Sequence, residues 1–126
     1  MSQFGHIDLR VSEMAPALAF YDQLLPALGF TETYHGEEWK VWATTEPLPS
    51  TAYFAITAEH GHVANGNRIA FWVATAAEVE RVTEIARSAG AGDLSGPKQM
   101  PYSRGYYASF FADPSGNLLE VYVRPE

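Results

Sequence analysis

The side chain with the most demanding chemistry lies in the segment GNRIAFWV, where Arg68 heads an otherwise apolar strand pattern. A guanidinium stays protonated at any pH that a folded protein meets, so a half-buried Arg68 must be paired, hydrated or directed at an anion. Arg68 is therefore a candidate ligand-binding residue, with either a carboxylate of the protein or an anionic group of a ligand as its partner. The alternative is a position at the rim of the site, where solvent or a surface acid is the partner.

Two histidines in the segment AEHGHVANG, His60 and His62, form an H-x-H pair. Side chains two residues apart lie on the same side of an extended segment. Such a pair supplies two donors of a His/His/carboxylate set of the kind that holds Fe(II), Zn(II) or Mn(II). The alternative interpretation is that both histidines are solvent-exposed members of a Gly-rich connection.

Aromatic side chains are abundant, and they supply the walls of a candidate pocket. Alternation along strands should direct several of them inward, and aromatic walls with a few placed polar groups are typical of small-molecule sites. An aromatic residue on a strand is equally an ordinary core residue. The candidates are Trp39, Trp42, Tyr53, Trp72, Tyr102, Tyr106, Tyr107 and Tyr122.

The segment QMPYSRGYY combines two hydroxyl donors, Tyr102 and Tyr106, with the cation of Arg104 between a proline and a glycine-containing turn. Such a loop is predicted to act as a lid over a ligand, and a plain surface loop is the alternative. Arg68 and Arg104 suit an anionic ligand, whereas the acidic net charge of the chain suits a cationic one. Charge alone does not choose between them.

Strand and helix patterns in the first half of the chain position these side chains. Residues 4–11 alternate polar and apolar positions, as a strand with one face on a core does. Ser12 is the predicted cap of a helix that ends near Leu28. Three short strand patterns follow, TETYH, EWKVWATT and TAYFAIT.

The second half of the chain starts the same pattern again. NRIAFWVA is a predicted strand, and Thr75 with Glu78 forms a capping box for a helix that ends near Ala89 and is closed by Gly90. A Gly- and Pro-containing loop is expected next, followed by the strand YYASFFAD, the turn DPSG and the strand NLLEVYVRP. Asp113 is interpreted as the residue that initiates this turn.

The two halves are an internal repeat. A shift of 62 residues places His6 on Arg68, Ile7 on Ile69 and Val11 on Val73. The prediction is an α+β fold in a single domain, residues 1–126, with module one at 1–58, a linker at 59–66 and module two at 67–126. Each βαβββ module covers one sheet face with its helix, so the uncovered faces are expected to enclose a cleft that binds the ligand.

Composition and charge exclude several classes of protein. With 126 residues and 47% hydrophobic content, the chain can bury one real core. Eight Lys and Arg against fifteen Asp and Glu leave a net charge of -7, which opposes binding to nucleic acid or to an anionic membrane. Cysteine is absent, and no signal, membrane-spanning, serine hydrolase or nucleotide-binding pattern occurs, so a cytoplasmic protein is expected.

HIDLRV, FYDQLLPALGF, RIAFWV and YYASFFADPSGNLLEVYV, in tandem βαβββ order, resemble the vicinal oxygen chelate superfamily over nearly the whole chain. This superfamily contains glyoxalase I, bleomycin resistance proteins, extradiol dioxygenases and fosfomycin-resistance transferases. The resemblance implies paired modules whose eight strands form a curved sheet around a cavity, commonly completed in a homodimer. It does not imply one activity, because isomerases, lyases, oxygenases, transferases and non-catalytic binders share the scaffold.

The resemblance also implies positions for a divalent ion such as Zn, Fe, Mn or Ni. His6 matches the first-strand ligand and Glu120 matches the last-strand glutamate. Ala55 and Arg68 stand at the two other ligand positions, and neither side chain coordinates a metal. Arg68 would then replace a metal ligand close to Glu120, where a guanidinium to carboxylate pair supplies part of the missing charge.

Two classes of function follow from these residues. The first is a metal-free protein that, like bleomycin resistance proteins, binds a small organic ligand in the cleft of a homodimer. The alternative is a divalent-metal-dependent lyase, isomerase or dioxygenase, in which His6 and Glu120 hold the ion and carry the catalysis. A looser third possibility is a metal-free enzyme with Glu120 as base beside Arg68. The predicted ligand-binding residues are Arg68, Tyr53, Trp72, Tyr102, Arg104, Tyr106 and Tyr122.

Overall fold

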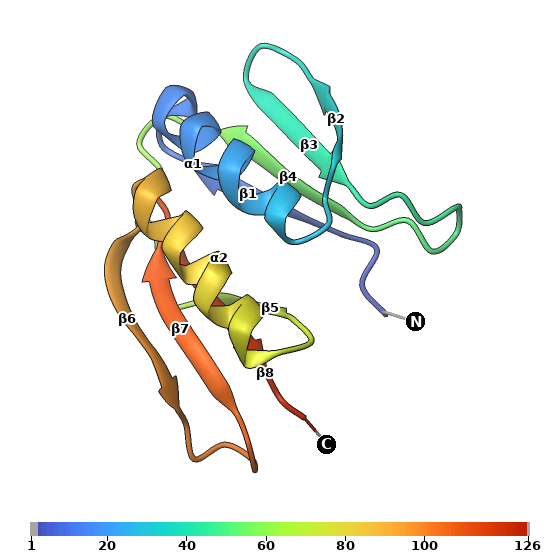
Figure 1. Cartoon of the computed structure of the whole chain (residues 1–126). Helices are drawn as coiled ribbons and strands as arrows, with labels where there is room; N and C mark the ends of the chain where they lie inside the picture. The colour runs from blue at the N-terminus through green and yellow to red at the C-terminus, as the bar shows by residue number, and fades with distance from the viewer. Residues whose placement is uncertain (1–2, 126) are drawn as a thin grey trace.

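The computed structural model describes residues 3–125, which contain eight strands and two helices (Figure 1). The first module consists of β1 (His6–Val11), α1 (Met14–Ala27), β2 (Glu32–His35), β3 (Trp39–Ala43) and β4 (Tyr53–Ala58). The second consists of β5 (Arg68–Trp72), α2 (Ala76–Ala89), β6 (Gly92–Gln99), β7 (Tyr107–Ala112) and β8 (Leu118–Val123). The predicted α+β class with two tandem βαβββ modules is confirmed.

The eight strands form two four-stranded sheets, with the strand orders β1-β4-β3-β2 and β5-β8-β7-β6. In each sheet the first and last strands of the module pair in parallel, and the other neighbours pair antiparallel. The sheets are not closed on one another, so the eight strands do not form one continuous hydrogen-bonded sheet.

The register of the parallel pairs confirms the internal repeat. Asp8 of β1 lies opposite Ala55 of β4, and Ala70 of β5 lies opposite Glu120 of β8. The 62-residue shift places Asp8 on Ala70, so Ala55 and Glu120 occupy equivalent positions in the two modules. A carboxylate in one module therefore corresponds to a methyl group in the other.

Both helices lie on the same side of the two sheets and pack against each other (Figure 1). Their buried faces and the inner faces of the strands form one core that spans the modules. Aromatic rings connect the two halves, with the Phe54 and Phe71 centroids 5.6 Å apart and the Phe20 and Phe111 centroids 6.4 Å apart. Within residues 3–125, neither helix is long and apolar enough to cross a membrane.

Helix α2 begins and ends as predicted. The Thr75 Oγ1 atom accepts a hydrogen bond from the backbone N–H of Glu78 at 3.1 Å, as in a capping box. The Glu78 carboxylate accepts from the backbone N–H of Ala74 at 2.8 Å, one residue before the expected donor. Gly90 ends the helix with a φ of 108°, a left-handed conformation that favours glycine.

The predicted cap of α1 is wrong. Glu13 occupies the N-cap position and makes no side-chain capping hydrogen bond. Ser12 instead contacts Ser115 in the turn between β7 and β8, with Ser115 Oγ 2.9 Å from the Ser12 backbone nitrogen and 3.1 Å from its hydroxyl oxygen. The Ser12 hydroxyl therefore makes a tertiary contact between the modules instead of capping α1.

The segment after α2, predicted as a loop, is strand β6. Two register shifts interrupt its pairing with β7, between Gly92 and Ser95 and between Ser95 and Lys98. Such bulges accommodate turn-forming residues within a ladder. Gly96 has a φ of 99°, and a Cβ atom there would lie 2.6 Å from the carbonyl oxygen of Ala108, so this close approach requires glycine.

Asp113 initiates the predicted turn and also joins the two modules. Its Oδ1 atom accepts from the backbone N–H groups of Ser115 and Asn117, at 2.8 and 3.0 Å. Its Oδ2 atom accepts from the Asn117 side-chain amide at 2.9 Å and from the Tyr21 hydroxyl of α1 at 2.6 Å. Both Asp113 and Tyr21 are buried. Burial, followed by the charge of Asp113, raises the pKa of Tyr21, so the phenol remains a donor.

Replacement of Tyr21 by phenylalanine tests the contact with Asp113. Tyr21→Phe keeps the ring in the core but removes one donor from a buried carboxylate, so we expect a loss of about 1.5 to 3 kcal/mol in the free energy of unfolding. Urea unfolding at neutral pH measures the difference.

Tyr107→Phe is the matched control. The Tyr107 hydroxyl donates to Glu80 at 2.8 Å in an exposed contact, so its removal should change the unfolding free energy by less than about 0.5 kcal/mol. Equal losses in the two variants would contradict a special role for the buried pair.

Candidate functional site

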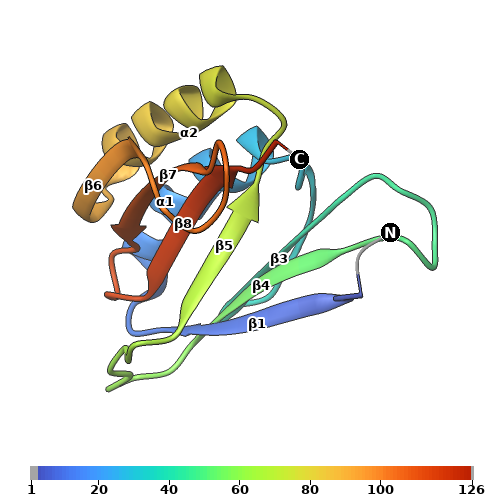
Figure 2. The same ribbon diagram turned by 90° about the horizontal axis from the view of Figure 1, so that it is seen from below.

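A cavity of about 1000 Å³ lies between the two modules. His6 of β1 and Tyr53 of β4 line it from the first sheet, and Ala70 and Trp72 line it from β5. The gap between β5 and the first sheet widens toward the C-terminal end of β5 (Figure 2). The cavity therefore brings together three of the predicted site residues, His6, Tyr53 and Trp72.

The apolar part of this cavity comes from core positions of the strands. Ile7, Phe54, Ile69 and Phe71 contribute to the lining and also belong to or pack against the core. Their polar neighbours alternate with them along each strand, as the pleat requires. An apolar floor with a few polar groups at the edge, in a volume near the upper end of the usual range for small-molecule sites, fits an organic ligand.

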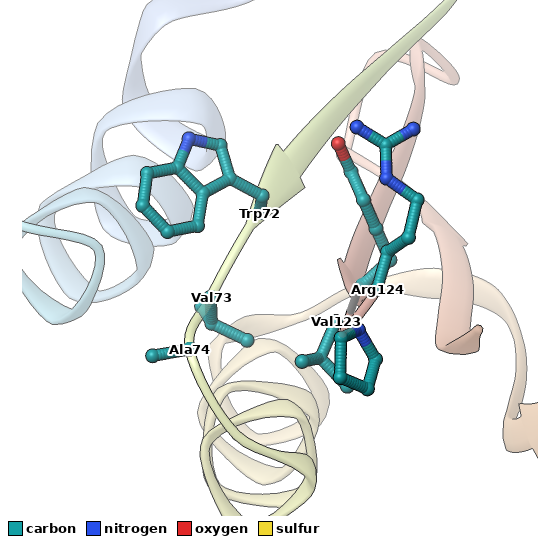
Figure 3. A pocket seen from close by; sticks show the side chains of 7 residues that line it. Trp72, Val73, Ala74, Val123 and Arg124 are labelled. Atoms are coloured by element: carbon teal, nitrogen blue, oxygen red, sulfur yellow. The ribbon is translucent and has the colours of Figure 1, made fainter. Parts of the chain in front are cut away.

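A second cavity, of about 470 Å³, lies at the C-terminal ends of β5 and β8 (Figure 3). Trp72, Tyr122 and Arg124 line it, and the Arg124 guanidinium lies 5.8 Å from the centre of the Tyr122 ring. The Trp72 side chain is 74% exposed and lines both cavities. Trp72 thus connects the cavity between the modules to the open face of the second sheet.

The predicted lid residues fold onto that open face. The Tyr106 ring stacks on the Tyr122 ring, with centroids 4.9 Å apart and planes 2° from parallel. Tyr102 contacts Tyr106 edge to face at 5.0 Å. The Tyr106 hydroxyl donates to Oε2 of Glu120, which is only 6% exposed. Tyr106 therefore covers the carboxylate that the sequence singled out.

The environment of Tyr106 keeps its phenol protonated. Burial makes the largest contribution to the raised pKa of Tyr106, and the hydrogen bond to Glu120 and the charge of Glu120 add to it. A negative phenolate beside a carboxylate in a poorly hydrated site is unfavourable. Tyr106 is thus a neutral hydrogen-bond donor near neutral pH and well above it.

Arg68 does not pair with Glu120, which corrects one of the two expected arrangements. Its Nη1 atom donates to the carbonyl oxygen of Leu119 at 2.7 Å, and its guanidinium carbon lies 5.1 Å from the centre of the Phe110 ring. No ion pair between Arg68 and an acid occurs within residues 3–125. The register explains this, because Arg68 lies opposite Leu118 and Glu120 lies two residues further along β8.

The H-x-H pair lies outside both cavities. The His62 Nε2 atom is 3.1 Å from Oδ1 of Asn117, so this ring connects the linker to the turn before β8. His60 is exposed, as its alternative interpretation expected. Arg104 is exposed in the loop before Tyr106 and makes no ion pair with another described residue.

The donors at the family's metal positions do not fit a divalent ion. Ala55 offers no ligand atom, Arg68 offers no lone pair, and one oxygen of Glu120 is already hydrogen-bonded to Tyr106. In the part of the chain that the structure describes, no group of three or more His, Cys, Asp or Glu side chains is arranged to hold a metal.

Sequence reasoning missed two residues beside Arg68, namely Phe110 and Lys98. The Lys98 ammonium nitrogen lies 6.0 Å from the centre of the Phe110 ring. Alternation in YYASFF places positions 106, 108 and 110 on one face, which could have identified Phe110. Lys98 gave no such signal, because its segment was predicted as a loop.

The chain belongs to the Glyoxalase/Bleomycin resistance protein/Dioxygenase superfamily, whose family model matches residues 3–121. This membership agrees with the resemblance that the sequence motifs carry. No protein of curated function matches the chain by sequence.

Solved structures share the fold over almost the whole chain. A glyoxalase/bleomycin resistance protein from Albidiferax ferrireducens T118 is 21% identical with a TM-score of 0.77, and the alignment covers 98% of this chain and 100% of that one. The genomically encoded fosfomycin resistance protein FosX from Listeria monocytogenes is 20% identical with a TM-score of 0.72, with coverage of 99% and 95%. A glyoxalase/bleomycin resistance protein/dioxygenase family enzyme from Burkholderia phytofirmans PsJN is 16% identical with a TM-score of 0.71, with coverage of 97% and 98%.

The contact between Tyr106 and Glu120 gives a titration test. Glu120→Gln removes the charge next to the phenol, so the pKa of Tyr106 should fall toward its ordinary value without reaching it, since burial remains. NMR titration of the tyrosine ring carbons measures each phenol separately.

Glu80→Gln provides the control for this titration. Its hydrogen bond to Tyr107 is the main reason that the pKa of Tyr107 is raised, so this variant should lower the pKa of Tyr107 and leave Tyr106 unchanged. An unaltered Tyr106 titration in Glu120→Gln would show that the two groups do not interact in solution.

Proposed function

We propose that this protein is a metal-independent, small-molecule-binding member of the superfamily, which holds an organic ligand with an aromatic body in the cavity between its modules. The observation that carries the proposal is Trp72, a large apolar side chain that is 74% exposed at the wall of the cavity. An indole left in water at the mouth of a pocket is stabilised when an aromatic ligand stacks on it. His6 and Tyr53 place polar groups on the opposite wall of the cavity.

The donor set supports a ligand site without a metal. Arg68 and Ala55 stand where the resemblance places metal ligands, and Tyr106 hydrogen-bonds to Glu120. Arg68 at a metal-ligand position and a Glu120 that already accepts from Tyr106 agree with the finding that no three His, Cys, Asp or Glu side chains within residues 3–125 are arranged to hold a metal. The site then binds through aromatic contact and hydrogen bonds rather than through coordination to an ion.

The relatives support a small organic molecule as the ligand. Resistance to bleomycin and to fosfomycin appears in the names of the family and of two structures that share its fold. Capture of a small molecule in a cleft needs no reacting group, which agrees with a site built mainly from aromatic and aliphatic side chains. Tyr122 lines the second cavity together with Trp72, and Tyr106 and Tyr102 extend this aromatic surface by packing on Tyr122 and on each other.

We also propose that the cleft is completed in a homodimer. The two sheets leave one face open, and Tyr34 and Leu48 are 59% and 77% exposed, an unfavourable arrangement for a lone protomer. If two copies bury their open faces against each other, the exposed apolar side chains and the bound ligand are both shielded from water.

Replacement of Trp72 tests the ligand site with a neutral aromatic probe, naphthalene-1-methanol. Trp72→Ala removes the indole on which the probe would stack, so the affinity measured by isothermal titration calorimetry should fall at least fivefold. The reason is that stacking between two aromatic rings contributes about 1 kcal/mol. Trp39→Ala, which removes a 42% exposed indole from β3 outside both cavities, should change the affinity less than twofold.

The same titration tests independence from metal. Probe binding should be unchanged after treatment with EDTA and after addition of Zn(II) or Mn(II). Protein purified without a tag that retains stoichiometric metal, and loses it in His6→Ala, would contradict the proposal and favour a metal-dependent enzyme.

Sedimentation equilibrium tests the homodimer. A mass twice that of the chain at micromolar concentration is expected, and Leu48→Glu should shift the equilibrium toward monomer because a charge then lies on the proposed contact surface. Wild-type protein that remains monomeric up to about 100 μM, where even a weak dimer with a micromolar Kd would have formed, would rule the dimer out.

A further inference from the structure

We infer that the ligand carries an anionic group, of the carboxylate, phosphate or phosphonate type, and that Arg68 and Lys98 bind this group beside Phe110 on the open face of the second sheet. The inference rests on the proposed function, because it names the chemical class of the same ligand, and it places the anionic group on the open face of the second sheet, outside the lining of both cavities. It adds a residue, Lys98, that lies outside the positions implied by the family resemblance.

Arg68 and Lys98 lie near one ring without an acidic partner in the described part of the chain. The chain has fifteen acidic residues and only eight Lys and Arg, so each cation has many acids to pair with. Arg10, Lys40 and Arg87 do so. Arg68 and Lys98 make no ion pair within residues 3–125. Arg81, Arg104 and Arg124 make none either. What distinguishes Arg68 and Lys98 is that they lie beside the same Phe110 ring without a carboxylate partner.

The two cations converge from opposite edges of the second sheet. Arg68 lies on β5 and Lys98 on β6, the two edge strands, with β8 and β7 between them. Both reach the same ring, at 5.1 Å for Arg68 and 6.0 Å for Lys98. Two like charges beside one ring repel each other. An anion placed near both cations is attracted to each of them and offsets this repulsion.

Each cation keeps donors for such an anion. Arg68 uses one N–H to fix its guanidinium against the carbonyl oxygen of Leu119 at 2.7 Å, and the remaining N–H groups of the guanidinium are free of protein acids. Lys98 donates to Oγ of Ser95 at 2.9 Å, which holds the ammonium in place and leaves further N–H groups. The guanidinium is therefore positioned before a ligand arrives, which reduces the cost of ordering it.

The surroundings favour an anion over a cation. Among the residues that β5, β7 and β8 direct to the open face, Glu120 is the only acid, and the Tyr106 hydroxyl already donates to it. The other neighbours on this face, Ala70, Ala112 and Leu118, carry no charge. Around the Phe110 ring, the two cations Arg68 and Lys98 thus meet one carboxylate from these three strands, Glu120, which already has a donor.

The anion site lies within reach of the proposed aromatic site. Ala70 lines the cavity between the modules and is two residues from Arg68 on the same strand face. A two-residue step along a strand is about 6.6 Å, roughly the span of an aromatic ring with one substituent. A ligand whose ring lies against Trp72 and Ala70 can therefore place an anionic substituent near Arg68.

A matched pair of probes tests the inference: 1-naphthyl phosphate, and naphthalene-1-methanol as its neutral counterpart. We expect the phosphate to bind at least tenfold tighter to wild-type protein in calorimetry, and this advantage to shrink as NaCl is raised, because exposed charges are screened. Arg68→Met and Lys98→Met should each weaken the phosphate at least fivefold and leave the neutral probe within twofold. Unchanged binding of the neutral probe also establishes that each variant is folded.

Arg87→Met is the control for general loss of positive charge. Arg87 pairs with Glu84 on the exposed side of α2, so its replacement should change the affinity for 1-naphthyl phosphate less than twofold. Arg68→Lys should restore part of the affinity, since it retains the charge but not the planar set of donors.

The outcomes separate the inference from the proposed function. Equal affinities for the two naphthyl probes, or loss of the phosphate in Arg87→Met as large as in Arg68→Met, would overturn the anion site while the aromatic site stands. Binding of inorganic phosphate that depends on Arg68 and Lys98, with no binding of the neutral probe, would support the anion site and overturn the aromatic one. Failure of both naphthyl probes and of inorganic phosphate would overturn both.

Discussion

The site depends on one constraint, the register of the two parallel strand pairs. Because side chains alternate along a strand, the pairing of Ala70 with Glu120 decides that Arg68, Glu120 and Tyr122 face the open side while Ile69, Leu119 and Val121 face the helices. A slip of one residue would direct a guanidinium and a carboxylate into the core, at a cost of several kcal/mol each. The burial of Leu119 and Val121 therefore fixes the positions of the polar groups between them.

The cavity exists because the modules meet through their helices and through one polar cluster rather than through a shared sheet. The helices and the aromatic contact between Phe54 and Phe71 hold the modules together on one side. Asp113 connects the turn before β8 to Tyr21 of α1, and Asn117 donates to the carbonyl oxygen of Arg10 at 2.9 Å. These contacts lie near the C-terminal end of β1, at Arg10. The strands β1 and β5 are therefore free to separate toward the N-terminal end of β1, where His6 lines the cavity.

Much of the fold could be predicted from the sequence because local patterns and packing agree. The alternation in HIDLRV and RIAFWV, the capping box at Thr75 and the stop at Gly90 each specify the structure that forms. The failures share a cause. Three features depend on residues far away in sequence: the contact of Ser12, the strand β6 and the hydrogen bond from Tyr106 to Glu120. In β6, a glycine next to a proline indicates a turn unless a neighbouring strand pairs with the segment through bulges. The family positions identified Arg68, whereas Lys98 and Phe110 join it only through the pairing of β6, β7 and β8.

In the proposed site, two side chains, Tyr106 and Arg68, take the two roles that a divalent ion would have. A divalent ion would neutralise Glu120 and attract the oxygen atoms of a ligand with the same charge. Here Tyr106, whose pKa is raised chiefly by burial and then by Glu120, hydrogen-bonds to the carboxylate as a neutral donor. Since Tyr106 satisfies Glu120, Arg68 need not, and its charge remains directed toward the open face beside Phe110. In the proposed anion site this arrangement leaves the guanidinium available to the ligand, because an Arg68 paired to Glu120 would have had little charge left to offer.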